Sequence, residues 1–245
     1  MNLNGKIALV TGAAKRVGRS IALSLARAGA DVIVHYNRSE DDAQATAATI
    51  ADIGRRAELT CADLARDDQI EAMFASIAEM FDNTHKPLDV LVNNASVYHQ
   101  TPITKLTAEA WDREMTVNAR AAALCIHHAI ALMPPGSAIV NITDISAEAP
   151  RANLPAYCAS KAALMALTKS TAKALAPNIR VNAVAPGAIL WEENISEDKK
   201  QRVLAQVPMK RTGRPEDIAA AVIFLCQNEY ITAQTLRVDG GWYMG

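Results

Sequence analysis

The chain has 245 residues, half of them hydrophobic and few of them aromatic, with a formal net charge of −1. This near-neutral balance offers no broad electrostatic field for nucleic acid or for an anionic membrane surface. No apolar run approaches the ~20 residues of a membrane helix, and the N-terminus has no signal-peptide pattern. The four cysteines are scattered without metal-ligand spacing, so we expect no metal site and a cytoplasmic protein with reduced thiols.

The first predicted strand, Ile7 to Val10, is followed by a glycine-containing turn and then by a helical pattern. In this order Gly12 permits a tight turn, and Gly18 permits a close approach of the backbone. The helix N-terminus then offers free N–H groups and a positive dipole end to a pyrophosphate. The sequence therefore predicts a dinucleotide site, with an ordinary strand-to-helix turn as the alternative. Three further loop residues are candidate cofactor contacts: Lys15, Arg16 and Val17.

The second predicted strand, 31–37, ends without the acid that binds a ribose 2′-hydroxyl about 20 residues beyond the glycine turn in NAD sites. A cation and several polar donors stand there instead, which suits a 2′-phosphate. We therefore expect NADPH as the cofactor, although Arg38 alone also fits a solvated loop cation. The candidate contacts are His35, Tyr36, Asn37, Arg38 and Ser39, with Lys15 from the first loop.

The third strand is predicted over 57–61, after a helix over 40–54. Asp63 follows this strand and fits two roles equally by spacing: accepting a hydrogen bond from an adenine amino group, or capping the helix that begins near Asp67. Leu64 beside it is a further candidate cofactor contact.

The fourth strand, 88–92, ends in a polar segment that starts with Asn93 and Asn94. Two amides at the carboxyl end of a strand are costly to bury without partners, so they must bond to backbone or to a ligand. The candidate cofactor contacts from this segment are Asn94, Ala95 and Ser96.

Two long helices are predicted in the second half of the chain. The first runs over 107–133 and is stopped by prolines. It contains Asn118, whose presence in a helix costs only ~0.5 kcal/mol and does not by itself demand a function. The second begins at Pro155, because proline suits a first helical position, and runs to about Pro177.

Between these helices lies a short apolar strand, 138–142, that ends in a polar cluster containing Asp144. Ligands of open α/β sheets bind at the carboxyl ends of the strands, so Asp144 faces the expected site. Tyr157 and Lys161 lie four residues apart and therefore share one face of the second helix. A nearby ammonium lowers the pKa of a phenol, so this pair suits a proton donor activated by a cation. Spacing alone also fits two surface residues.

The remaining predicted elements are a strand over 179–184, a helix over 215–227 and a last strand over 235–238. Pro186 and Gly187 follow the first of these strands and are candidate cofactor contacts. The polar segment 188–212, which contains Trp191, is expected to be a substrate-binding lid. Strand and helix alternate over 1–245 without a linker or repeat. This predicts a single α/β domain with a doubly wound (Rossmann) parallel sheet of about seven strands and helices on both faces.

The chain resembles the short-chain dehydrogenase/reductase family over its whole length. The matching segments are Thr11-Gly12…Gly18, Asp63, Asn93-Asn94-Ala95, Asn118, Tyr157…Lys161, Pro186-Gly187 and Asp239-Gly240-Gly241. The resemblance implies NAD(P)-dependent oxidoreduction with Asn118, Tyr157 and Lys161 in the active site, where Lys161 also binds the nicotinamide ribose. It further implies that the two long helices pair across a subunit boundary, commonly in a homotetramer.

Two departures from the common family pattern are similar to the pteridine reductase branch. Arg16 stands at the middle glycine of the usual T-G-x-x-x-G-x-G motif, and Asp144 stands at the usual serine, thirteen residues before Tyr157. Ser96 and Tyr98 match positions where this branch has a serine near the cofactor phosphates and an aromatic ring that stacks on the pterin. In the wider family a threonine is frequent where this chain has Trp191. The resemblance implies these substrate contacts: Arg16, Ser96, Tyr98, Asp144, Tyr157 and Trp191.

The two departures also make chemical sense together. A carboxylate beside Tyr157 opposes ionisation of the phenol and accepts its hydrogen bond, so Asp144 is expected to hold the donor protonated. Reduction of a C=N bond needs a hydride at carbon and a proton at nitrogen, and it tolerates a weaker oxyanion stabiliser than ketone reduction. We therefore expect an NADPH-dependent pteridine reductase acting on a small-molecule pterin, dihydropterin or dihydrofolate. The alternatives are a carbonyl or 3-ketoacyl-thioester reductase of the same family and, in another class, a non-catalytic NADP-sensing protein.

Overall fold

The computed structural model, which describes residues 1–84, 87–191 and 195–244, is built on one sheet of seven strands. The strands lie in the order β3-β2-β1-β4-β5-β6-β7, and every neighbouring pair is parallel. Their bounds are β1 (Ile7–Val10), β2 (Asp31–Tyr36), β3 (Ala57–Cys61), β4 (Val90–Asn93), β5 (Ser137–Ile142), β6 (Ile179–Pro186) and β7 (Thr235–Val238). The predicted fold class is confirmed.

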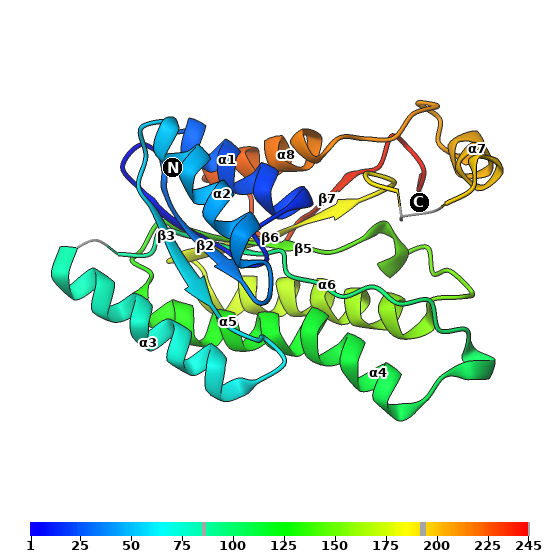
Figure 1. The fold of residues 1–245 in the computed structure, drawn as a ribbon, viewed down its shortest axis with the longest axis horizontal. Coiled ribbons are helices and arrows are strands. Elements are labelled where there is room, and N and C mark those ends of the chain that lie inside the picture. The colour runs from blue at the N-terminus through cyan, green and yellow to red at the C-terminus, as the bar shows by residue number, and fades with distance from the viewer. Residues whose placement is uncertain (85–86, 192–194, 245) are drawn as a thin grey trace.

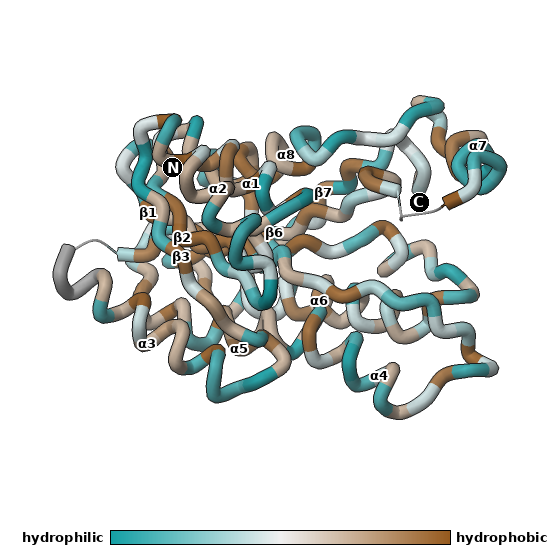
Figure 2. The backbone as a smooth tube through the Cα atoms, in the orientation of Figure 1, coloured by the Kyte–Doolittle hydropathy of each residue, from teal (hydrophilic) through white to brown (hydrophobic). Residues whose placement is uncertain are grey.

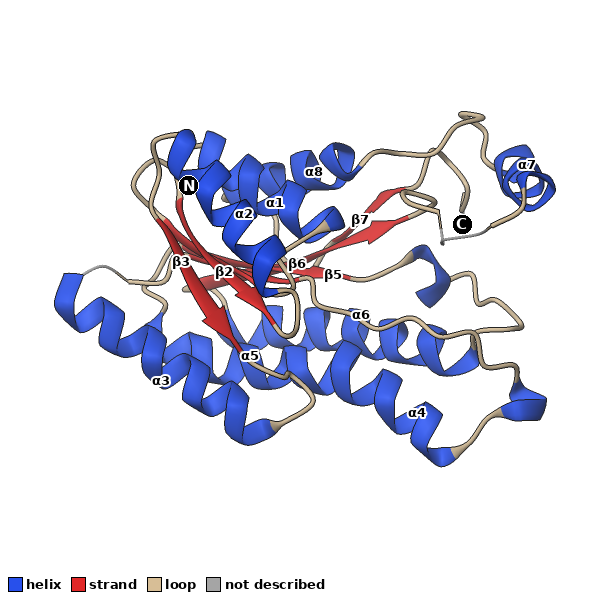
Figure 3. Ribbon diagram, viewed as in Figure 1, coloured by secondary structure: helices blue, strands red, loops and turns tan. Residues whose placement is uncertain are grey.

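Helices cover both faces of the sheet, as Figure 1 and Figure 3 show. One layer contains α1 (Arg16–Arg27), α2 (Glu40–Asp52) and α8 (Pro215–Gln227). The other layer contains α3 (Asp67–Thr84), α4 (Ala108–Met115), α5 (Ala121–Ala129) and α6 (Pro155–Leu175). The remaining helix, α7 (Glu197–Gln206), lies at one end of the molecule beside the C-terminal segment. Among the described residues, no helix is long and apolar enough to cross a bilayer.

Alternate residues of the inner strands pack into separate apolar cores on the two faces. Along β1, Ala8 and Val10 belong to the core under α1 and α8, and Ile7 and Leu9 belong to the core under α3 and α5. Successive side chains of a strand point to opposite faces, and a parallel sheet is covered on both, so its strands read as continuous apolar runs. Figure 2 shows hydrophobic colour along the strands, whereas hydrophilic colour gathers in the loops and on α7.

The order of the strands reverses between β1 and β4, which are neighbours in the sheet. Ligands of doubly wound sheets bind outside the carboxyl ends of the strands at such a switch point. Val10 pairs with Val92, so the polar segments after the two strands leave the sheet side by side. The glycine turn therefore lies next to the segment that begins at Asn93.

The predicted helical run over 107–133 is helical from Ala108 to Leu132, but it is not a regular α-helix throughout. After α4 the chain makes a π-helical turn, η2 (Thr116–Arg120), before α5 begins at Ala121. The short 3₁₀ turns are η1 (Ile103–Lys105), η3 (Ile130–Leu132) and η4 (Ile145–Ala147). A π turn adds one residue to a helical turn and occurs often at functional sites. This one contains Asn118. The ends of the other predicted helices and strands shift by only a few residues.

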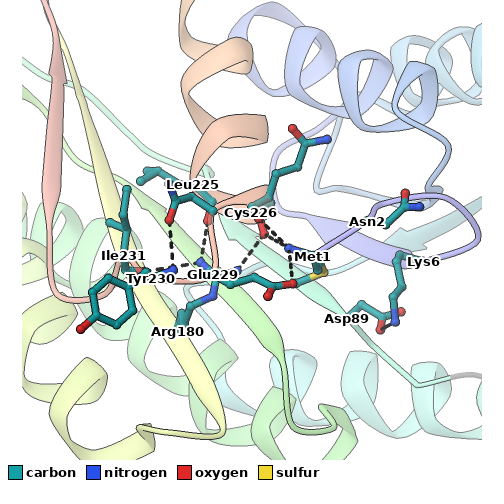
Figure 4. A network of polar contacts seen from close by, with 12 residues as sticks. Met1, Asn2, Lys6, Asp89, Arg180, Leu225, Cys226, Glu229, Tyr230 and Ile231 are labelled. Atoms are coloured by element: carbon teal, nitrogen blue, oxygen red, sulfur yellow. Dashed lines mark hydrogen bonds and ion pairs between the residues drawn. The ribbon is translucent and has the colours of Figure 1, made fainter.

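Arg180 of β6 ties the sheet to the end of α8, as Figure 4 shows. Its Nη1 donates to the Leu225 carbonyl at 2.7 Å, and its Nη2 donates to the Cys226 carbonyl at 2.7 Å. The ammonium of Met1 also donates to the Cys226 carbonyl, at 3.2 Å. The last carbonyls of a helix have no partner within the helix, and the dipole there favours a cation.

We expect Arg180→Leu to lower the melting temperature of the protein. The change leaves the part-buried Leu225 carbonyl without a donor among the described residues and the Cys226 carbonyl with the Met1 ammonium alone. This costs about 1–3 kcal/mol, and each kcal/mol lowers Tm by roughly 2–4 °C in a chain of this size. Thermal melts followed by circular dichroism at a fixed protein concentration measure the change. Arg27→Leu, at an exposed arginine of α1, is the matched control. Equal melting temperatures for the two variants would contradict this role of Arg180.

Candidate active site

The glycine turn after β1 is fixed by close backbone packing. A Cβ atom at Gly18 would lie 2.1 Å from the Gly12 carbonyl oxygen, so no other residue fits there. Gly12 has a φ of 64°, a conformation that glycine adopts without strain. Asn94 holds the turn from the β4 side, because its Nδ2 donates to the Thr11 carbonyl at 2.9 Å and to the Gly12 carbonyl at 3.2 Å. The Asn94 side chain therefore shapes the loop rather than facing a ligand.

His35 holds the same turn from the β2 side. Its ring is 2% exposed, its Nδ1 accepts from the Gly12 N–H at 3.0 Å, and its Nε2 lies 3.0 Å from the Ala62 carbonyl. Burial lowers its pKa to about 4, and the bond to the Ala62 carbonyl opposes part of that shift. A neutral ring with its proton on Nε2 satisfies both contacts. This corrects the expectation of a side-chain contact between His35 and a cofactor, since both ring nitrogens bond backbone.

Arg16 begins α1 in a left-handed conformation, with a φ of 56°. Residues other than glycine pay roughly 1–2 kcal/mol for this conformation, and functional sites are where such strain is often kept. The side chain is exposed at the end of the sheet that carries the glycine turn. Ala233 has a similar φ of 62°, so the conformation alone does not prove a function.

The segment after β2 presents an exposed cation. Arg38 is exposed, and no ion pair to it is found among the described residues. Lys15, the second predicted cation, lies 3.6 Å from Asp42 of α2. Asn37 offers its carbonyl to the Cys61 thiol at 3.3 Å, and Ser39 precedes α2 without a side-chain cap bond.

The predicted contacts after β3 are used within the protein. The Asp63 carboxylate accepts from the Ala65 N–H at 3.0 Å, and the Asp63 N–H donates to Gln69 Oε1 at 2.6 Å. Asp63 thus stabilises the turn before α3. Its carboxylate bonds Ala65 and not the first turn of α3, so this is not the predicted helix cap, and the contact with an adenine amino group stays a prediction. Leu64 is 6% exposed and its side chain packs into the core, so only its backbone is free to face a ligand.

Tyr157 lies at the carboxyl end of β5 with a carboxylate as its partner. Its hydroxyl donates to Asp144 Oδ2 at 3.0 Å, and Asp144 Oδ1 accepts from the Ser146 N–H at 2.7 Å. Burial raises the pKa of Tyr157 well above its usual value, and the charge and hydrogen bond of Asp144 raise it further. The phenol therefore stays protonated at neutral pH. The charge of Arg151 opposes this shift.

Lys161 is one turn further along α6 and is 2% exposed. Its Nζ donates to the Ile142 carbonyl at 3.0 Å and lies 5.7 Å from the centre of the Tyr157 ring. Burial lowers its pKa to about 8, and the carboxylates of Asp144 and Glu114 oppose that shift. Burial and the Asp144 carboxylate thus determine the pKa of the Tyr157 phenol. The expected lowering of this pKa by Lys161 is outweighed.

Asn118 points inward from the π turn and is 1% exposed. Its Oδ1 accepts from Ser96 Oγ at 3.0 Å and from the Val97 N–H at 2.8 Å. Its Nδ2 faces the Val97 carbonyl at 3.0 Å, Glu114 Oε2 at 2.9 Å and Ser160 Oγ at 3.0 Å. Asn118 therefore joins the segment after β4 to α4 and α6.

The remaining predicted contacts lie around this centre. Tyr98 meets Tyr157 edge-on, with ring centres 4.9 Å apart and planes at 76°. A Cβ at Gly187, which follows Pro186, would lie 2.7 Å from Asp239 Cα, so Gly187 permits close packing there. Trp191 is half-buried, and the next three positions of the predicted lid, 192–194, lie outside the described residues. Val17 packs against the core, and the Ala95 N–H donates to Thr11 Oγ1 at 3.0 Å.

Comparison with known proteins identifies the family. Residues 12–243 match a family model described as enoyl-(acyl carrier protein) reductase. The chain is 37% identical to the 3-oxoacyl-[acyl-carrier-protein] reductase FabG of Staphylococcus epidermidis, over 98% of this chain and 99% of that relative. The chain belongs to the short-chain dehydrogenase/reductase family.

Solved structures of the family agree with this membership. The angucycline C-6 ketoreductase LanV with bound NADP superposes with a TM-score of 0.94 at 32% identity, covering 100% of this chain and 98% of that one. A short-chain dehydrogenase from Burkholderia cenocepacia in complex with NADP gives a TM-score of 0.91 at 34% identity, covering 99% of each chain. The family is thereby confirmed, but the pteridine reductase branch is not specifically indicated.

The glycine turn of this short-chain dehydrogenase/reductase has the shape that a dinucleotide phosphate needs. Side chains are absent where the backbone comes closest, at Gly12 and Gly18, and the first turn of α1 follows directly. Free N–H groups and the helix dipole at that position favour an anion. No group of three metal-ligating side chains is found among the described residues.

Several residues of this centre do not follow from sequence pattern. Asn118 belongs to one hydrogen-bonded group with Glu114, Ser160 and His99. The distances in sequence between these residues and Asn118 match no known sequence motif. The Ser146 hydroxyl is buried, and no hydrogen-bond partner for it is found in the part of the chain that the structure describes. An acid at an inward position of a helix is the one signal that points to Glu114, since carboxylates are rarely buried without a partner.

We expect the stability of the protein to depend on His35 as the pH falls. The pKa of His35 is about 4 when folded and 6.5 ordinarily, so protonation favours the unfolded chain. This stabilisation is complete above pH 6.5 and is lost as the pH falls toward 4. The full effect is about 3 kcal/mol, because each pKa unit corresponds to about 1.36 kcal/mol.

Denaturant titrations between pH 6.5 and 4.5 measure this dependence. The unfolding free energy of His35→Gln is expected to fall less steeply with decreasing pH than that of the wild type, because glutamine does not titrate. His127→Gln, at an exposed histidine, should keep the wild-type slope. A His35→Gln slope equal to that of the wild type would show that the ring is not held neutral.

Proposed function

We propose that this chain is an NADPH-dependent reductase of a flat nitrogen heterocycle, that is, a pteridine reductase acting on a pterin, dihydropterin or dihydrofolate. NADP in the solved relatives supports the cofactor, as does the fit of the glycine turn to a pyrophosphate. The exposed Arg38 at the end of β2, where no acid stands, supports the phosphorylated form. NADPH is thus assigned to the edge of the sheet that carries these residues.

The observation that carries the substrate assignment is the hydrogen bond from Tyr157 to Asp144. A serine is usual at position 144 in the family that the sequence resembles, and a serine does not oppose ionisation of the phenol. Here burial and the carboxylate keep the proton on Tyr157. Arg16 adds a planar fork of donors in the phosphate loop, which suits the polar edge of a heterocycle.

The proposed reaction uses Tyr157 as the proton donor. Bound NADPH supplies the hydride for the ring carbon. Tyr157 gives its proton to the ring nitrogen, and Lys161, 5.7 Å from the centre of the phenol ring, offsets the negative charge that remains. Asn118 anchors the segment after β4 beside this pair. Tyr98 and Arg16 come from neighbouring strand ends and are proposed to bind the face and the edge of the heterocycle.

A carbonyl or 3-ketoacyl-thioester reductase is the second candidate, and the comparisons support it better than they support pterin reduction. The two named relatives, FabG and LanV, are called a 3-oxoacyl-[acyl-carrier-protein] reductase and a ketoreductase. The same scaffold hosts both chemistries, and fold does not fix the substrate. Asp144 and Arg16 favour the heterocycle.

Two structural roles are proposed along with this function. The segment 188–212, whose described part contains α7, is proposed to cover the substrate. A homotetramer is proposed through the helices of the lower layer in Figure 1, where α4, η2, α5 and α6 line an open groove of about 440 Å³. The apolar residues of this groove are Met115, Ala119, Ala123, Ala163 and Leu167.

We expect NADPH to be preferred over NADH, and Arg38→Asp to reverse or erase this preference. A carboxylate repels a 2′-phosphate and accepts hydrogen bonds from a ribose 2′-hydroxyl. The ratio of kcat/KM for the two cofactors is the measurement. Arg27→Asp, at an exposed arginine of α1, should leave the ratio unchanged. An unchanged ratio in Arg38→Asp as well would remove Arg38 from the cofactor site.

We expect Arg16→Gly and Tyr98→Ala each to lower kcat/KM for a dihydropterin by about tenfold or more, because they remove guanidinium hydrogen bonds and aromatic stacking. The wild type and variants are compared by NADPH oxidation with dihydrobiopterin, dihydrofolate, an acetoacetyl thioester and simple ketones. Because Arg16 has a φ of 56°, its glycine variant should be at least as stable as the wild type.

Ala233→Gly controls for this relief of strain, since Ala233 has a φ of 62°. Its kcat/KM for the dihydropterin should stay at the wild-type value. A wild type that reduces the keto-thioester and no pterin would refute the substrate assignment in favour of the second candidate.

A further inference from the structure

Glu114 of α4 is a buried acid that the proposed reaction does not use. It is 1% exposed, and both of its carboxylate oxygens accept hydrogen bonds. Oε1 accepts from the His99 N–H at 3.0 Å and lies 2.9 Å from His99 Nδ1, and Oε2 accepts from Asn118 Nδ2 at 2.9 Å. A buried carboxylate is costly unless it is paired and hydrogen-bonded, and such groups gather at functional sites.

The carboxylate helps to hold the Asn118 amide in one orientation, together with the N–H and carbonyl of Val97 and the Ser160 hydroxyl. Because an ionised carboxylate only accepts hydrogen bonds, the NH₂ group of Asn118 must face Glu114. The amide oxygen is then turned toward Ser96 Oγ and the Val97 N–H, at 3.0 and 2.8 Å. An apolar side chain at position 114 would leave the orientation to the Val97 and Ser160 contacts alone.

Glu114 also holds the segment that carries Tyr98. Its bonds go to the backbone and to the ring of His99, the next residue in the chain. Tyr98 in turn meets the Tyr157 ring edge-on at 4.9 Å. The His99 side chain is 46% exposed, so the pair joins the protein surface to the centre of the site.

A third link is electrostatic. Lys161 is 2% exposed, and the two carboxylates whose charges act on it are those of Asp144 on the strand side and Glu114 on the α4 side. Burial alone disfavours the ammonium form. Each carboxylate therefore helps to keep Lys161 charged beside Tyr157.

We propose that Glu114 is a positioning residue of this reductase. It helps to orient the Asn118 amide, fixes the segment carrying Tyr98 and supports the positive charge of Lys161, with His99 as its partner at the surface. This role rests on the proposed function, because it acts through the groups that the reduction is proposed to use.

The test replaces Glu114 by glutamine, which keeps the size of the side chain and removes its charge. We expect kcat to fall by roughly 10- to 100-fold, as displaced catalytic groups typically cause. The alkaline limb of the kcat profile should move to lower pH, because the pKa of Lys161, about 8, loses one of its two supporting charges. Glu109→Gln removes an exposed carboxylate from the same helix and should change neither.

A second readout does not depend on turnover. Lysine labelled with ¹³C at Cε reports the titration of Lys161 by NMR, and the Lys161→Met variant identifies its signal. We expect the midpoint in Glu114→Gln to fall by about half a pH unit or more. Glu114→Asp keeps the charge but shortens the reach, so it should keep the midpoint and still lose activity.

The outcomes separate this proposal from the proposed function. Unchanged kcat, pH profile and Lys161 midpoint in a folded Glu114→Gln would overturn it. If the wild type reduces none of the tested substrates, the proposed function fails, and the Lys161 midpoint alone decides the role of Glu114. If the Glu114→Gln variant does not fold, the His99→Ala variant tests the proposal instead, because the His99 side chain is half exposed. A several-fold loss of kcat in His99→Ala supports the positioning role of Glu114, and an unchanged kcat overturns it.

Discussion

The hydrogen bond from the Tyr157 phenol to Asp144 sets the chemical character of this site. A buried phenol next to a carboxylate keeps its proton, whereas a phenol next to an ammonium alone tends to lose it. Lys161 lies close enough to stabilise the phenolate once the proton has left. In the proposed reaction this neutral phenol donates its proton to the ring nitrogen.

The sheet makes this arrangement possible because it brings the loops after β1, β2, β4, β5 and β6 to one edge. Two polar residues, the buried His35 and the half-buried Asn94, fix the glycine turn from the strands on either side of β1. Asn118 and Glu114 fix the segment after β4 against the π turn. These contacts are internal and require no ligand. The loops are thus held in place before a cofactor or substrate binds, which reduces the cost of ordering them.

The sequence predicts the scaffold well because buried parallel strands and glycine turns leave strong local patterns. The run Ile7 to Val10 and the glycines that follow it specify a strand, a turn and a helix without knowledge of the rest of the chain. Tyr157 and Asp144 come together because the segment 143–154 returns from the end of β5 to the start of α6 beside it. The orientation of His35 is harder to predict, because the pattern shows a polar end of the strand but not on which face of the sheet the ring lies. An acid at an inward position of a helix points to Glu114, but no local pattern records its partner His99 or the π turn.

The most direct test of the account replaces Asp144 by serine. The ratio of kcat/KM for a dihydropterin to that for an acetoacetyl thioester is measured in the wild type and in Asp144→Ser under the same conditions. If the carboxylate adapts Tyr157 to a ring nitrogen, the ratio falls by about tenfold or more, chiefly through loss of dihydropterin reduction. A ratio that stays the same in Asp144→Ser would contradict the account, because the carboxylate would then play no part in the choice of substrate.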